Sequence, residues 1–140
     1  FRIDDENFNC VEIPEVAPAG VLDYSTMSDK EYRKNTPVCT GFLWYFPDAI
    51  DLIAQNSMVG HFQHNDPSKP MKWDREKSAD EPDALVRHLK DHAKNPVDDD
   101  GTLHLSKMAW RSMAMLQKFI EENPDLKPYG DAIKKLSESE

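Results

Sequence analysis

The sequence predicts an all-α fold, namely an antiparallel helical bundle with an extended irregular N-terminal arm. Three observations predict it: apolar residues recur at helical spacing in several segments, residues typical of helix N-termini precede these segments, and prolines follow them after short links. Helices joined by short links pack antiparallel to one another. We therefore expect an arm over residues 1–28 and a helical domain over residues 29–140.

Composition restricts the class of protein. The chain has 140 residues, which is enough to bury a core without disulfides or a structural metal. Its formal net charge is -9 and its Lys and Arg residues are scattered, so we expect no binding to duplex nucleic acid or to an anionic membrane surface. No apolar run reaches the roughly 20 residues that cross a bilayer, and no signal peptide is recognisable. We expect a cytoplasmic protein, and the sequence leaves open whether Cys10 and Cys39 form a disulfide.

The first helical segment follows the arm. Pro14, Pro18 and Gly20 interrupt any periodicity in the arm, which we expect to pack across the domain or onto a partner. Ser28 and Glu31 are spaced as in a capping box, so they predict a short helix that ends before the next proline.

A longer helix is predicted to begin at Pro47, because proline is favoured in the first helical turn. The aromatic run before it, residues 42–46, is expected to pack in the core or at the helix entry; the alternative is a stacking wall for a base or a partner peptide, with Trp44 in contact. Residues 65–82 are rich in Pro, Asn and Asp and predict a loop, which Trp73 indicates is ordered and packed.

Two further helices complete the bundle. Asp83 is expected to open a helix over about residues 84–94, which Asn95-Pro96 stops. Thr102 or Ser106 is expected to cap a last long helix, and a short helix near residues 131–136 is expected to cover one end. The inward stripe of the long helix is predicted to be Met108, Ala109, Ser112, Met113, Leu116, Phe119 and Ile120.

Paired carboxylates begin the list of candidate site residues. Asp48 and Asp51 are three residues apart, so they share one face of their helix and can hold a divalent metal. The alternative is that they are ordinary first-turn acids, which the helix dipole favours.

Histidines form the second group of candidates. His88 and His92 are four residues apart, a spacing that lets both imidazoles reach one ion; the alternative is one half-buried and one surface histidine. His61 and His64 are interpreted as part of a solvated helix end. If the helices on either side of the acidic turn are antiparallel, His88 and His104 both face the space between them.

The acidic turn at residues 98–100 lies directly before His104 and can offer oxygen ligands beside an imidazole; the alternative is a solvated acidic turn. Arg87 and Arg111 can neutralise phosphates, because the guanidinium group matches phosphate geometry. The alternative for each arginine is a surface ion pair.

Two motifs carry a resemblance to a known family. One segment reads Asp-Ala-Leu-Val-Arg-His-Leu from Asp83, and a later one reads Asp-Asp-Gly-Thr-Leu-His-Leu from Asp99 and leads into a long apolar helix. Over about residues 42–120 the chain resembles the phage and bacterial dATP/dGTP diphosphohydrolase-like family. The resemblance implies a MazG-like all-α fold, a homo-oligomer, and cleavage of a nucleoside triphosphate to the monophosphate and pyrophosphate with Mg²⁺ or Mn²⁺.

The resemblance implies functional roles for Arg87, His88, one acid among residues 98–100, and His104. Together with the candidates named above from spacing and residue type, these residues give the following expectations. His88, His104 and Arg87 are expected to be catalytic, and Trp73, Arg111 and Lys72 to bind the substrate. The expected metal ligands are Asp48, Asp51, Asp99 and Asp100. One departure from the family pattern is that Asn95-Pro96 stand where the family has Gly-Glu. A second hypothesis therefore stays open. It is that the chain is a non-catalytic acidic interaction or structural protein of phage type, which engages a protein partner through its arm and aromatic run.

Overall fold

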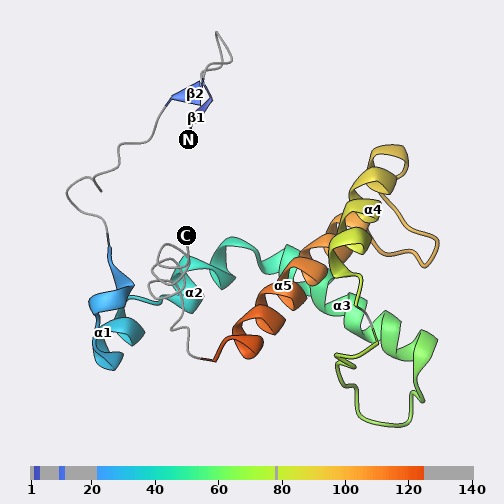
Figure 1. The fold of residues 1–140 in the computed structure, drawn as a ribbon. Coiled ribbons are helices and arrows are strands. Elements are labelled where there is room, and N and C mark those ends of the chain that lie inside the picture. Colours follow the sequence, from blue (N-terminus) through green and yellow to red (C-terminus); the bar gives the residue numbers. More distant parts are fainter. Residues whose placement is uncertain (1, 4–9, 12–21, 78, 125–140) are drawn as a thin grey trace.

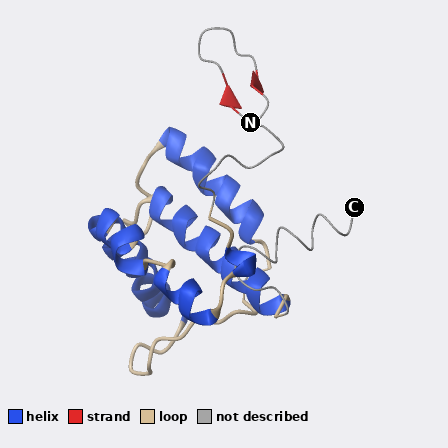
Figure 2. Cartoon of the chain, turned by 90° about the vertical axis from the view of Figure 1, so that its left-hand side faces the viewer, coloured by secondary structure: helices blue, strands red, loops and turns tan. Residues whose placement is uncertain are grey.

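The computed structural model describes residues 2–3, 10–11, 22–77 and 79–124, and most of these are helical (Figures 1 and 2). The predicted all-α fold is confirmed. A short antiparallel pairing joins β1 (Arg2–Ile3) to β2 (Cys10–Val11). In the last part of the arm, residues 22–28, the Tyr24 hydroxyl donates to the Asn35 carbonyl, so this part packs against the short helix that follows. The packing expected for residues 1, 4–9 and 12–21 and the helix expected near residues 131–136 lie outside the described residues.

The four longer helices of the described residues follow one another in the predicted order, and three short helical elements, at residues 24–26, 38–41 and 43–45, were not predicted. In chain order, the helical elements are η1 (Tyr24–Thr26), α1 (Asp29–Lys34), α2 (Val38–Gly41), η2 (Leu43–Tyr45), α3 (Pro47–His64), α4 (Glu81–Lys94) and α5 (His104–Glu122). In the described part of the chain, no helix is long and apolar enough to cross a bilayer. Cys39 is an exposed free thiol, whereas the side chain of Cys10 is outside the described part.

Helices α4 and α5 form an antiparallel hairpin, and α3 crosses α5 (Figure 1). The crossing is fixed by polar contacts, since Asn56 donates to the Ser106 hydroxyl at 3.0 Å and the Trp110 indole donates to the Ser57 hydroxyl at 3.1 Å. Helices α1 and α2 lie beside this three-helix body and connect to it through η2 (Figure 1).

Two helix starts agree with their sequence signals. At α1, the Ser28 hydroxyl accepts a hydrogen bond from the Glu31 amide at 3.3 Å, and the Glu31 carboxylate accepts one from the Ser28 amide at 2.8 Å. This is the predicted capping box. Helix α3 begins with Pro47 in its first turn, also as predicted.

The start of α4 differs from the prediction. The helix begins at Glu81, and Pro82 lies inside its first turn instead of ending the preceding loop. The reason is that an amide in the first turn has no partner within the helix, so proline loses nothing there. Asp80, at the N-cap position, makes no capping bond; its carboxylate accepts a hydrogen bond from Arg87 at 2.8 Å.

The start of α5 also differs, because neither Thr102 nor Ser106 caps it. Leu103 is the N-cap residue and makes no side-chain capping bond. Ser106 lies inside the first turn and donates to the Leu103 carbonyl at 2.8 Å, while Thr102 donates to Asp100 at 2.6 Å. The Thr102 hydroxyl therefore hydrogen-bonds within the acidic turn, and the Ser106 hydroxyl hydrogen-bonds within the first turn of α5.

The apolar stripe predicted for α5 does not form a closed core. Its second half is exposed, with Met113 at 53% and Leu116 at 55% of their full accessibility. Among the described residues, the buried apolar side chains are Ala84 and Ala114 alone. Helical spacing identifies residues that share a face, but it does not say which face the neighbouring helix covers.

The aromatic run is exposed as well, so the prediction of core packing is wrong for it. Trp44 is 71% exposed and Tyr45 is 68% exposed. Phe42 and Phe46 contact each other with ring centroids 5.6 Å apart. The run therefore forms a local aromatic surface on η2, next to the start of α3.

A buried ion pair holds α4 to α5 at the end of the hairpin away from the turn. Glu81 is 5% exposed, and its carboxylate accepts a hydrogen bond from Lys118 at 2.7 Å. Burial is the largest single influence and raises the pKa of Glu81. The hydrogen bonds from Lys118 and from its own backbone amide, together with the positive charges of Lys118 and Arg111, outweigh it, so the pKa lies below the ordinary value.

We expect Lys118→Met to lower the free energy of unfolding by about 3 kcal/mol, because it leaves a buried carboxylate without its partner. Urea unfolding at pH 7 measures the change. The double variant Glu81→Gln, Lys118→Met removes the charge and should recover part of the loss. A single variant as stable as the wild type would show that the pair contributes nothing.

Candidate functional site

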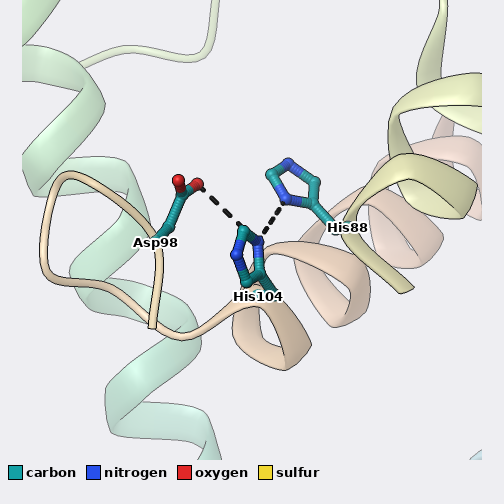
Figure 3. A group of neighbouring side chains, drawn as sticks. All are labelled: His88, Asp98 and His104. Carbon is teal, nitrogen blue, oxygen red and sulfur yellow. Dashed lines mark hydrogen bonds and ion pairs between the residues drawn. The ribbon is translucent and has the colours of Figure 1, made fainter. Parts of the chain in front are cut away.

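Two histidines from different helices meet at the turn of the hairpin (Figure 3). His88 lies in the third turn of α4 and His104 is the first residue of α5. Their Nδ1 atoms are 2.9 Å apart, so one ring donates a hydrogen bond and the other accepts it. This is the juxtaposition that the sequence predicted for two antiparallel helices. His92 does not join His88: its buried Nδ1 has no hydrogen-bond partner in the described chain.

Asp98 is the third member of this group. Its carboxylate oxygen lies 3.8 Å from Nδ1 of His104, and the potential ligand atoms of His88, Asp98 and His104 all lie within 4.8 Å of one another. Asp99 and Asp100 were the turn acids expected as ligands, but Asp99 is exposed and Asp100 faces Lys107. The correction follows from the geometry of the turn, which directs neighbouring acids to different sides.

Local sequence explains why the turn has this shape. The Asp98 amide donates to the Thr102 carbonyl at 2.8 Å, and the Gly101 amide donates to the Asp98 carbonyl at 2.9 Å. Gly101 has φ of 83°, a left-handed conformation that only glycine adopts without strain. The tight turn thereby brings Asp98 back to the first residue of α5.

Lys107 is a central residue of the site that sequence reasoning missed. Its ammonium donates to Asp98 at 2.5 Å and to Asp100 at 2.7 Å. Burial alone lowers the pKa of Lys107, but its bonds to the two carboxylates raise it above the ordinary value. One signal was available: Lys107 is three residues after His104, on the same helix, directly beyond the acidic turn.

The two carboxylates are held in their charged form. The hydrogen bond from Lys107 is the main cause of the low pKa of Asp98. Burial alone raises the pKa of Asp100, but bonds from Lys107 and Thr102 lower it far below its ordinary value. Both side chains are therefore anionic at neutral pH.

The imidazole of His88 is kept neutral. Burial is the largest cause that lowers its pKa, and the positive charge of Lys107 and the neighbouring His104 lower it further. A neutral imidazole has one nitrogen with a free lone pair. His88 can therefore accept a proton or bind a cation at neutral pH.

A large cleft opens beside this group. Its volume is about 750 Å³, and its walls come from the end of α3, the loop that follows, and one face each of α4 and α5. Most residues that the sequence singled out line it: Lys72, Trp73, Arg87, His88, Asp100 and Arg111. The fold thus brings together residues that lie up to about 40 positions apart in the chain.

The cleft combines positive charge with aromatic surface. Lys107 and Lys77 add to the cations already named, and Trp110 adds a second indole. The rings of Trp73 and Trp110 meet edge to face with centroids 5.7 Å apart, and the Arg75 guanidinium lies 4.2 Å above Trp73. Trp73 itself is packed, as predicted, whereas the other described residues of its loop are exposed.

His61 also lines the cleft, and its interpretation as part of a solvated helix end is wrong. It is buried, and its Nδ1 has no hydrogen-bond partner among the residues described here. His64, one turn further on, is exposed as expected. An unpartnered buried nitrogen is costly, which is a reason to expect a polar ligand or water beside it.

Asp48 and Asp51 are not part of the site. They are exposed on the first turns of α3 and line neither this cleft nor the smaller cavity beside the acidic turn. Asp48 is eight residues from Asn56, where α3 meets α5, which is about 12 Å along the helix axis. The expectation that these carboxylates share one ion with the acidic turn is therefore not met in this chain.

The chain matches no protein-family model, and no curated protein or solved structure matches it significantly.

Proposed function

We propose that the protein is a metal-dependent nucleoside triphosphate pyrophosphohydrolase that acts on purine ribonucleotides or purine deoxyribonucleotides. The observation that carries the proposal is that one cleft of about 750 Å³ combines cationic side chains, indole rings and a neutral histidine. The volume is in the range of small-molecule sites. Cations suit the phosphates, indoles suit the base, and a neutral histidine suits proton transfer.

Binding of the substrate is assigned to the walls of the cleft. Arg87, Arg111 and Lys72 contact the phosphates, and Trp73 stacks on the base. The chain carries a net charge of -9, so this local group of cations also directs an anionic substrate to one place. Mg²⁺ or Mn²⁺ arrives on the triphosphate, where it neutralises phosphate charge, and Asp100 is the turn carboxylate that lines the cleft.

Proton transfer is assigned to His88. When its Nδ1–H donates to Nδ1 of His104, its Nε2 carries the lone pair, and Figure 3 draws this nitrogen on the side of the ring away from His104. Nε2 takes a proton from the water that attacks the α-phosphorus, the bond from this phosphorus to the bridging oxygen breaks, and pyrophosphate leaves with that oxygen. His104 keeps the His88 ring oriented. Arg87 and Arg111 stabilise the charge that develops on the phosphate oxygens.

Pyrophosphate release tests the proposal. A panel of ribo- and deoxynucleoside triphosphates is incubated with Mg²⁺, with Mn²⁺ or with EDTA. We expect release from purine nucleotides that EDTA abolishes. A folded sample that releases no pyrophosphate from any triphosphate would refute the enzyme hypothesis.

The pH dependence of the reaction gives a second test. His88 must be deprotonated to act as a base, and its pKa is lowered from the ordinary value of 6.5. We therefore expect kcat/KM to decline at low pH with a midpoint below 6.5. A decline centred at or above 6.5 would mean that another group is the base.

A second candidate function is protein association, and the exposure of the aromatic run favours it. Trp44 and Tyr45 are largely exposed, and so is the outer face of α5. Exposed apolar patches of this kind mark interaction surfaces. We propose a second copy of the chain as the partner, because few apolar side chains of the described residues are buried in one copy.

Sedimentation of the wild type and of a Trp44→Ser, Tyr45→Ser variant tests this interface. A wild-type dimer that the variant loses supports the interface, and a wild-type monomer refutes it.

A further inference from the structure

We propose that His88, Asp98 and His104 form a binding site for one divalent first-row transition-metal ion, of which Zn²⁺ is the example, distinct from the Mg²⁺ or Mn²⁺ that accompanies a nucleotide. Two imidazole nitrogens and one carboxylate oxygen converge there from α4, the acidic turn and α5 (Figure 3). Imidazole is a ligand that zinc and its neighbours prefer, whereas Mg²⁺ prefers oxygen alone.

The spacing of the donor atoms fits such an ion. Two ligands of a tetrahedral Zn²⁺ with bonds of about 2.05 Å are roughly 3.3 Å apart. The two Nδ1 atoms are 2.9 Å apart, and the Asp98 oxygen is 3.8 Å from Nδ1 of His104. These two separations bracket the expected value. The ligand atoms of His88 and Asp98 are at most 4.8 Å apart, so the Asp98 side chain has to move toward His88 by up to about 1.5 Å to complete the site.

The metal-free arrangement leaves an electrostatic conflict that a cation removes. If Nδ1 of His104 accepts the hydrogen bond from His88, its lone pair lies within 3.8 Å of an Asp98 carboxylate oxygen. The potential ligand atom of His88 also lies within 4.8 Å of that of Asp98. A cation between the three groups removes the repulsion between the imidazole lone pair and the carboxylate, because it binds both. Each histidine then binds through Nδ1 and carries its proton on Nε2.

The site is both fixed and accessible. His104 is 5% exposed, which holds one ligand in place. His88 lines the large cleft, while Asp98 and His104 line a second cavity of about 240 Å³. Three protein ligands leave a coordination position that water or a substrate oxygen can fill from either cavity.

Lys107 is the competitor for this site. Its ammonium already neutralises Asp98 at 2.5 Å, and its charge opposes that of an incoming ion. Asp100 can hold Lys107 alone, at 2.7 Å, when Asp98 turns to the metal. The exchange lowers the affinity for metal but leaves every charge paired.

Zinc titration of the full chain, free of any tag, tests the site. We expect one equivalent of Zn²⁺ to bind saturably, as measured by competition with a colorimetric chelator. We expect bound Co²⁺ to show the visible absorption typical of a site with a low coordination number. His88→Gln should weaken binding by more than about 100-fold, since even the loss of a group that only supports a ligand costs 10–100-fold. The matched control is His92→Gln, one turn further along the same helix, which should bind as the wild type does.

A second measurement needs no variant. In NMR spectra of the wild type, Zn²⁺ should shift the imidazole signals of His88 and His104 and leave those of His92 in place. The proposal fails if the wild type shows no saturable binding, if these two histidines do not respond, or if His92→Gln weakens binding as much as His88→Gln does.

One consequence rests on the proposed function. A zinc-bound His88 carries its proton on Nε2 and cannot act as a base, so Zn²⁺ should inhibit pyrophosphate release in the presence of Mg²⁺. The two hypotheses separate cleanly. Zinc binding without any hydrolysis refutes the proposed activity alone, and hydrolysis without zinc binding refutes the metal site alone.

Discussion

His88→Gln should lower kcat/KM for pyrophosphate release by about 10²- to 10⁴-fold, the usual effect of losing a general base. Glutamine is similar in length and can still hydrogen-bond to Nδ1 of His104, which lies 2.9 Å from His88. It cannot take a proton from water at neutral pH. The loss should therefore appear in kcat more than in KM, because the phosphate-binding side chains stay in place.

His92→Gln is the matched control for this experiment. His92 is on the same helix and is also half-buried, but it is absent from the lining of the large cleft. It should therefore leave kcat/KM unchanged. If His88→Gln retains full activity with an unaltered melting temperature, His88 is not the base, and the cleft binds its ligand for another purpose.

Lys107→Met should lower the free energy of unfolding by about 3 kcal/mol, as expected when one partner of a largely buried ion pair is removed. The side chains of Lys107, Asp98 and Asp100 are 21%, 23% and 16% exposed. Without Lys107, two half-buried carboxylates lie close together and lose a shared donor. Urea unfolding measures the loss, and Lys90→Met, at an exposed lysine of α4, is the control that should change little.

The pH dependence of this difference has a defined sign. The pKa values of Asp98 and Asp100 lie below their ordinary value of 3.8, so their contribution is present above that pH and is lost as the pH falls below it. The pKa of Lys107 is raised above 10.5, so its contribution is present below that pH and is lost above it. The wild type should therefore exceed Lys107→Met in stability mainly between about pH 4 and pH 10. Equal stability of the two at pH 7 would refute the role assigned to Lys107.

The sequence by itself determined the local structure. A serine at the N-cap position and a glutamate three residues later can bond each other at the start of any α-helix, and proline fits the first turn of any helix, so the starts at Ser28 and Pro47 were both predictable. The antiparallel hairpin also followed from a short link between two helices, and with it the meeting of His88 and His104. Each of these depends on residues that are near in the chain or joined by one turn.

Only the tertiary structure decided the rest. The rotation of α5 against α4 directed Lys107 inward and Met113 outward, because two helices can pack through any face that allows contact. The crossing of α3 with α5 at Asn56 left Asp48 outside the site. The turn at Gly101 selected Asp98 over Asp99 as the acid beside His104. Spacing along the chain determines which residues share a helical face. Which face is buried depends on the free energy of contacts between helices, and these contacts form only in the tertiary structure.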